Sequence, residues 1–81
     1  MDRAISRIVA AFGGVRPFAK AIERPASTVQ YWPAQGFLPR TVRQEVLDAL
    51  VDRGVERAEA ERLVEKAIAG LEIPAPVGIS G

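Results

Sequence analysis

Residues 18–32 read FAKAIERPASTVQYW and predict two short helices joined by a tight turn. Pro25 marks the break, because the residue before a proline is pushed out of the helical region of backbone angles. We expect one helix over about residues 15–22 and another over about residues 26–32. Pro33 is expected to end the second helix, since a proline lacks the N–H that a helix interior needs.

The apolar residues of this stretch are spaced to pack the two helices together. Ala19 is small enough for a close crossing, and Ile22 and Val29 are placed to meet in the angle between the helices. Trp32 follows Val29 by three residues and is expected on the same buried face. The other positions of the second helix then face outward: Ala26, Ser27, Gln30 and Tyr31.

This outward face is compatible with the major groove of DNA. A helix about 10 Å long fits the groove and presents its N-terminal residues to base edges. A glutamine amide pairs with adenine and a serine hydroxyl with several bases. The alternative is that Ser27 and Gln30 are ordinary polar surface. Tyr31 has two alternatives that the sequence does not separate. It can contact a thymine methyl group or a phosphate, or it can pack against the next loop.

Apolar residues at helical spacing predict three further helices. One covers about residues 2–12 and ends at Gly13-Gly14, because glycine adopts the left-handed conformation at low cost. The other two cover about residues 41–53 and 56–71. No stretch alternates with period two, so no strand is expected and the predicted fold class is all-α.

Two connecting segments complete this prediction. Residues 33–39 are expected to form a loop, with Phe37 and Leu38 turned inward. Residues 72–81, which contain two prolines and two glycines, are expected to form an extended or disordered tail.

The charges are divided unevenly along the chain, although the net charge is only +1. Residues 1–43 carry seven basic and two acidic side chains, a net +5, whereas residues 44–81 carry four basic and eight acidic ones, a net −4. Uneven charge in a short chain can arise by chance, but a basic half also suits a polyanion. As a set, the basic residues then predict phosphate contacts: Arg16, Lys20, Arg40 and Arg43.

The composition argues against several classes of protein. Cysteine and histidine are absent, which excludes disulfides and thiolate metal sites and removes the commonest general acid and base. No nucleophile–base pair, glycine-rich phosphate loop or metal-ligand cluster is visible, so we expect no enzyme activity, metal, cofactor or small-molecule ligand. The absence of cysteine and of a visible signal peptide predicts a cytoplasmic protein. The sequence also has no apolar run of about 20 residues, so no membrane partner is expected.

The run from Phe18 to Trp32 resembles the helix-turn-helix of the lambda-repressor/Cro class. A wider stretch, about residues 5–50, is similar to a small bacterial and phage group within it called carph-isopro. The features in common are Phe12-Gly13-Gly14, Ser27-Thr28-Val29-Gln30, Trp32 and Gly36-Phe37-Leu38-Pro39. The resemblance implies a five-helix domain that binds operator DNA, often as a dimer.

The same resemblance assigns individual roles. It places Ala26, Ser27, Gln30 and Tyr31 on the recognition helix. It places Thr28 where a phosphate is touched or the helix is braced, Arg16 at the start of a helix that rests on the DNA backbone, and Arg40 where a basic residue meets phosphate. The turn position that usually carries glycine, because it needs a positive φ, is Glu23 here, at a cost on the order of 1 kcal/mol.

The C-terminal helix allows two interpretations. Its apolar stripe, Leu63, Val64, Ile68 and Leu71, can pack on the preceding helix of the same chain or against a second copy. Residues 1–53 would then form the helix-turn-helix domain, with residues 54–71 as an amphipathic helix that can dimerise. A dimer suits the near-palindromic operators of this class, whose half-sites lie about 34 Å apart.

The sequence therefore predicts a DNA-binding transcriptional regulator that binds double-stranded DNA as a homodimer. A small repressor of phage or mobile-element origin is the form that we expect. The alternative is a protein-interaction module, such as an antitoxin or assembly factor, that uses the same scaffold and binds DNA weakly. The acidic half and the tail would be its working surface.

Overall fold

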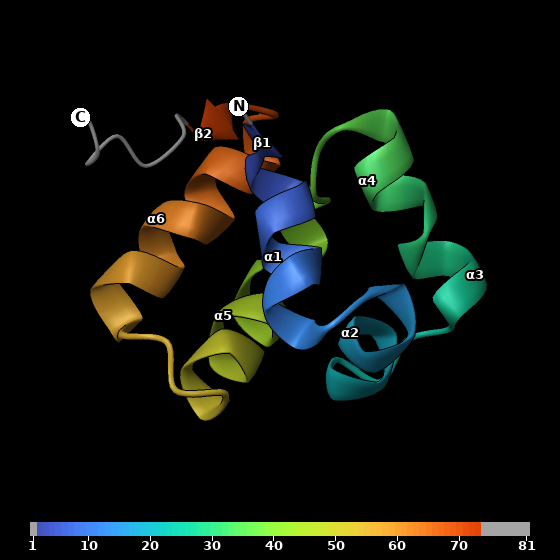
Figure 1. Cartoon of the computed structure of the whole chain (residues 1–81), viewed down its shortest axis with the longest axis horizontal. Coiled ribbons are helices and arrows are strands. Elements are labelled where there is room, and N and C mark those ends of the chain that lie inside the picture. Colours follow the sequence, from blue (N-terminus) through green and yellow to red (C-terminus); the bar gives the residue numbers. More distant parts are fainter. Residues whose placement is uncertain (1, 74–81) are drawn as a thin grey trace.

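The computed structural model describes residues 2–73, which are helical apart from one pair of two-residue strands (Figure 1). The predicted all-α class is confirmed. In chain order the elements are β1 (Asp2–Arg3), α1 (Ala4–Phe12), α2 (Val15–Ala21), α3 (Ala26–Val29), α4 (Tyr31–Gln35), the 3₁₀ helix η1 (Arg40–Val42), α5 (Arg43–Asp52), α6 (Arg57–Ile68) and β2 (Glu72–Ile73). Within this part of the chain, every helix is too short or too polar to cross a membrane.

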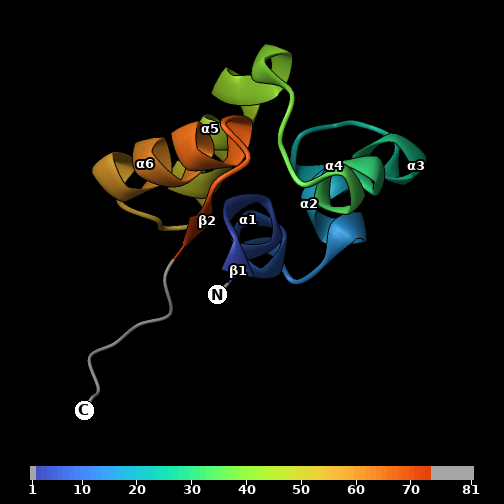
Figure 2. The ribbon, with the colours of Figure 1, turned by 90° about the horizontal axis from the view of Figure 1, so that it is seen from above.

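Helix α1 lies at the centre of the fold, with α5 and α6 on one side and α2, α3 and α4 on the other (Figures 1 and 2). Its inner face is buried from Ala4 to Phe12. The Phe12 ring stacks on Phe18 of α2, with ring centroids 5.0 Å apart, and Phe18 meets Trp32 of α4 edge-on at 6.0 Å. Aromatic pairs at these distances stabilise a core beyond their buried area, so this row joins α1, α2 and α4.

The turn between α2 and α3 has the conformation that the resemblance to the lambda-repressor/Cro class implies. The N–H of Arg24 donates to the carbonyl of Ala19 at 2.9 Å, and that of Glu23 donates to the carbonyl of Lys20 at 3.2 Å. This pair of bonds is a Schellman motif, in which the residue after the helix cap adopts the left-handed conformation. Glu23 occupies that position with φ +58°, so the expected positive φ is confirmed.

Replacing Glu23 with glycine is expected to stabilise the protein by up to about 1 kcal/mol, because glycine adopts a positive φ without a steric penalty. For a domain of this size, 1 kcal/mol corresponds to a rise of about 4–8 °C in Tm. Glu23→Gln removes the charge but retains the strain, and its Tm should change much less. If both variants melt alike in a thermal scan, the carboxylate and not the backbone is the source of the effect.

The predicted helix over residues 26–32 is in fact two helices, and Pro33 does not end it. α3 and α4 are separated at Gln30, whose backbone angles are still helical (φ −64°, ψ −20°). A single helix running through Pro33 would press the proline ring against the carbonyl of Val29, four residues earlier. The helix breaks before the proline and starts again, so Pro33 falls in the first turn of α4, where its missing N–H costs little.

The two ends of the described chain pair with each other, so the expectation of no strand is wrong. β1 and β2 are antiparallel, and the N–H of Ala4 donates to the carbonyl of Leu71 at 3.0 Å. The first helix therefore begins at Ala4 instead of residue 2, and the last ends at Ile68 instead of Leu71. Two-residue strands are too short to show an alternating pattern in the sequence. Residues 74–81 of the predicted tail lie outside the described residues.

Helix α6 packs inside its own chain, against α1 and α5. Ala60, Val64 and Ala67 on its inner face are fully buried. The carbonyl of Ala67 accepts a hydrogen bond at 2.9 Å from the N–H of Leu38, which is buried as predicted, whereas Phe37 is 44% exposed and not turned inward. The core of residues 2–73 thus continues through α6 and does not stop at residue 53.

Candidate nucleic-acid interface

The four predicted base-contact positions lie on α3, α4 and the residue between them. Ser27, Gln30 and Tyr31 are exposed, with Tyr31 at 66%, whereas Ala26 is half-buried and packs against the core. Val29 and Trp32 are buried on the opposite side, as predicted. The side of α3 and α4 that faces away from the core therefore presents a hydroxyl, an amide and a phenol.

The crossing of α2 and α3 accounts for this orientation. α2 and α3 are in contact, and Ala19 and Ile22, which the sequence predicts to pack between them, are both buried. Larger residues at Ala19 would separate the helices, because a packed core tolerates little added volume. Because the apolar sides of α2 and α3 are buried against each other and the core, the polar side chains of α3 face the solvent.

The predicted phosphate contacts fall into two groups. Arg16 and Lys20 are exposed on α2, one helical turn apart on the same face, and Thr28 is exposed on α3, the helix that packs against α2. Arg40 is exposed on η1, which packs against α5. In the part of the chain that is described, Arg16, Lys20 and Arg40 take part in no ion pair. Their charges are therefore available to an external anion.

Two other arginines are held by carboxylates. The Nε of Arg43 donates to Glu65 of α6 at 2.5 Å, so this predicted phosphate contact is directed toward α6. Arg24 donates from Nη2 to both carboxylate oxygens of Glu45 on α5, at 2.8 and 3.0 Å, and from Nε to one of them at 3.1 Å. This forked pair connects the turn after α2 to α5. Sequence spacing does not reveal this pair, because its partners are 21 residues apart.

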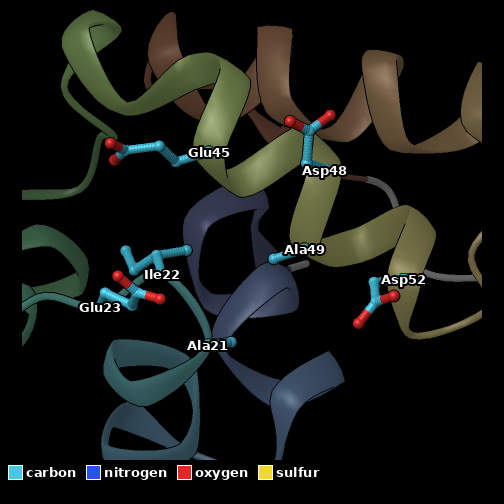
Figure 3. Close-up of a pocket in the computed structure, with 7 residues that line it drawn as sticks. All are labelled: Ala21, Ile22, Glu23, Glu45, Asp48, Ala49 and Asp52. Atoms are coloured by element: carbon cyan, nitrogen blue, oxygen red, sulfur yellow. The ribbon is translucent and has the colours of Figure 1, made fainter.

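Beyond this ion pair, an acidic groove separates the turn from α5 (Figure 3). It is open to solvent, has a volume of about 420 Å³, and is lined by Ala21, Ile22, Glu23, Glu45, Asp48, Ala49 and Asp52. Figure 3 shows three carboxylates along α5 and that of Glu23 across from them. A DNA backbone would be repelled by such a surface, and among residues 2–73 no acidic cluster has the geometry of a metal site. The acidic spacing along residues 45–52 is the sequence signal for this groove.

The predicted dimer stripe is divided by the packing of α6. Val64 is fully buried in the chain's own core, and Leu63 and Ile68 are partly buried against that core. Leu71 lies after the end of α6 and is 52% exposed. Of the two interpretations of this stripe, the structure therefore supports packing within one chain for most of its length.

The exposed polar side of α3 and α4, with the unpaired cations of α2 next to it, is thus the surface that the predicted DNA contacts define. The helices that carry this surface bury their opposite, apolar sides in the core. Compared with known proteins, the chain matches no family model, no curated protein and no solved structure.

Proposed function

We propose that the protein is a sequence-specific DNA-binding transcriptional regulator with a lambda-repressor/Cro-like domain. The observation that carries the proposal is the α2–turn–α3 geometry. α2 packs against α3 with Ala19 buried, the turn at Glu23 has positive φ, and Ser27, Gln30 and Tyr31 are exposed. In this proposal α3 and the start of α4 enter the major groove of double-stranded DNA.

The backbone of the DNA is held by the cations that flank this surface. Arg16 and Lys20 of α2 contact phosphates on one side and Arg40 of η1 on the other, while the hydroxyl of Thr28 donates a further bond. Each phosphate that a cation neutralises releases counterions, which makes binding salt-dependent. Arg43 has a smaller part in this scheme, because Glu65 already occupies its guanidinium.

The proposed regulator acts in the cytoplasm as a homodimer, most simply as a small repressor of phage or mobile-element type. Two copies would read half-sites about one helical turn of DNA apart. Because the inner face of α6 is buried in the core of its own chain, the contact with a second copy would involve exposed residues near the end of α6. Leu71 is the one residue of the predicted stripe that is mostly exposed. The molar mass of the chain, free and on a duplex with two half-sites, tests this point directly.

Two substitutions separate base reading from phosphate binding. Gln30→Ala should lower affinity for the preferred duplex by about 5- to 150-fold and leave affinity for unrelated duplexes unchanged, because it removes one base contact. Lys20→Ala should weaken binding to every duplex and reduce the slope of log affinity against log salt by about 0.9. Fluorescence anisotropy titrations at several salt concentrations measure both effects, on a duplex selected from a random pool.

Arg62→Ala is the matched control. It removes one exposed positive charge from α6, on the far side of the central α1, and should leave both the affinity and the salt slope unchanged. If Lys20→Ala and Arg62→Ala behave alike, only overall charge matters and the proposed docking is wrong.

A protein-interaction module is the second candidate, and the acidic groove is the observation that favours it. The three of its carboxylates that form no ion pair in the described part of the chain, those of Glu23, Asp48 and Asp52, would suit a basic segment of a partner protein. Asp48→Asn together with Asp52→Asn should leave DNA affinity unchanged or slightly raised if the protein is a regulator. Equal and weak binding of the wild type to all duplexes, with a partner protein lost in this double variant, would support the interaction module.

A further inference from the structure

The segment that carries the proposed base contacts has no charged residue. Residues 26–39 read ASTVQYWPAQGFLP and include α3, α4 and the loop to η1, whereas 26% of the whole chain is charged. The nearest cation before the segment, Arg24, is held in the forked pair with Glu45. The outward surface of α3 and α4 therefore offers neither a free guanidinium nor a carboxylate of its own.

The exposed residues of this segment are spaced to line one side of it. Ser27, Gln30 or Tyr31, and Ala34 are exposed at intervals of three or four residues. Within the described residues, the side chains of Ser27, Gln30 and Tyr31 form no hydrogen bond, so their polar atoms are available. The amide of Gln35 differs, because it donates to the carbonyl of Phe37 at 3.1 Å.

In the major groove, each of the four bases presents different hydrogen-bonding and apolar groups and is therefore matched by different side chains. Guanine presents two acceptors, which arginine or lysine matches, and cytosine presents a donor, which a carboxylate accepts. Adenine presents one acceptor and one donor, which an amide matches, and thymine presents a methyl group that apolar surface covers. The α3–α4 surface carries the amide and the apolar groups but lacks the side chains that favour guanine and cytosine.

From this we infer that the base pairs contacted by α3 and α4 are A·T pairs. The Gln30 amide binds an adenine through N7 and the exocyclic amine, and Tyr31 or Ala34 covers a thymine methyl group. The Ser27 hydroxyl hydrogen-bonds to a neighbouring adenine or thymine. The inference rests on the proposed DNA-binding function and adds to it the composition of the half-site.

The test begins with selection of duplexes from a random pool by the full chain, and with footprinting of the selected site. A·T pairs are expected at the protected major-groove positions. Replacing the contacted adenine with 7-deazaadenine should lower affinity by about 5- to 150-fold. Replacing the contacted thymine with uracil, which removes only the methyl group, should lower it by about fourfold.

A change of specificity provides the sharper measurement. Gln30→Arg should select guanine at the position where the wild type selects adenine, since arginine matches the two acceptors of guanine. Gln35→Arg is the matched control: it adds the same charge to α4 and should leave the selected bases unchanged, because Gln35 is turned toward Phe37.

The outcomes separate this inference from the function on which it rests. Selected sites with G·C pairs at the protected positions, or an unchanged preference in Gln30→Arg, would overturn the A·T assignment and leave DNA binding in place. Failure of the wild type to enrich or bind any duplex overturns both.

Discussion

Ser27→Glu is expected to lower affinity for every duplex by at least about a hundredfold. In the proposed complex, a carboxylate at this position of α3 faces phosphates and base acceptors, and like charges brought together at an interface cost several kcal/mol. The fold should be retained, because Ser27 is exposed and an acidic side chain is tolerated in the first turn of a helix. Anisotropy titration at physiological salt measures the loss, and circular dichroism checks the fold.

The chain offers a closely matched control in Ala58→Glu. Ala58 is the second residue of α6, as Ser27 is the second residue of α3, and both are exposed. Each substitution lowers the net charge by one unit. If Ala58→Glu weakens DNA binding as much as Ser27→Glu does, the effect is one of net charge and α3 does not face the DNA.

A chain that ends at Gly54, and so lacks α6, is expected to lose cooperative unfolding altogether. The truncation removes Ala60, Val64 and Ala67 from the core and exposes the faces of α1 and α5 that they cover. It also removes the Ala67 carbonyl that binds the buried Leu38. A chain of this length cannot lose much of its core and stay folded, since small domains bury a smaller fraction of their surface than large domains do. Thermal unfolding followed by circular dichroism should show no sigmoidal transition.

Leu71→Ala is the comparison for this truncation. Leu71 is half exposed and lies beyond the end of α6, so its loss should cost less than about 1 kcal/mol. A chain ending at Gly54 that still melts cooperatively near the wild-type Tm would contradict the packing of α6 against α1 and α5. In that case α6 would be free to pair with a second copy, as the other interpretation of its apolar stripe requires.

Features that depend on neighbouring residues could be predicted from the sequence. The burial of Ala19, Ile22, Val29 and Trp32 was predicted from the spacing of the apolar residues around the turn. The positive φ of Glu23 was expected from the resemblance of residues 18–32 to a helix-turn-helix, and the structure has it. These predictions concern local backbone angles and the side of a helix on which a residue lies, and the nearest residues determine both.

The surface proposed to face DNA was only partly predictable. The spacing of Ser27, Gln30 and Tyr31 places them outward, and the structure agrees. Arg43 met the same sequence criteria as Lys20, yet its guanidinium lies against Glu65 of α6. Sequence spacing shows which residues are exposed, but it does not show which exposed charges another helix neutralises.

By itself the sequence determined the all-α class, the two helices around the turn at Glu23 and the residues that pack between them. Only the tertiary structure decided that α6 lies in its own chain's core, that β1 pairs with β2, and that Arg24 is bound by Glu45. The physical reason is the range of the interactions. Helix periodicity and turn geometry are set within a few residues, whereas the contacts of α6 with α1, of β1 with β2 and of Arg24 with Glu45 join segments at least about 20 residues apart and exist only once the whole core has assembled.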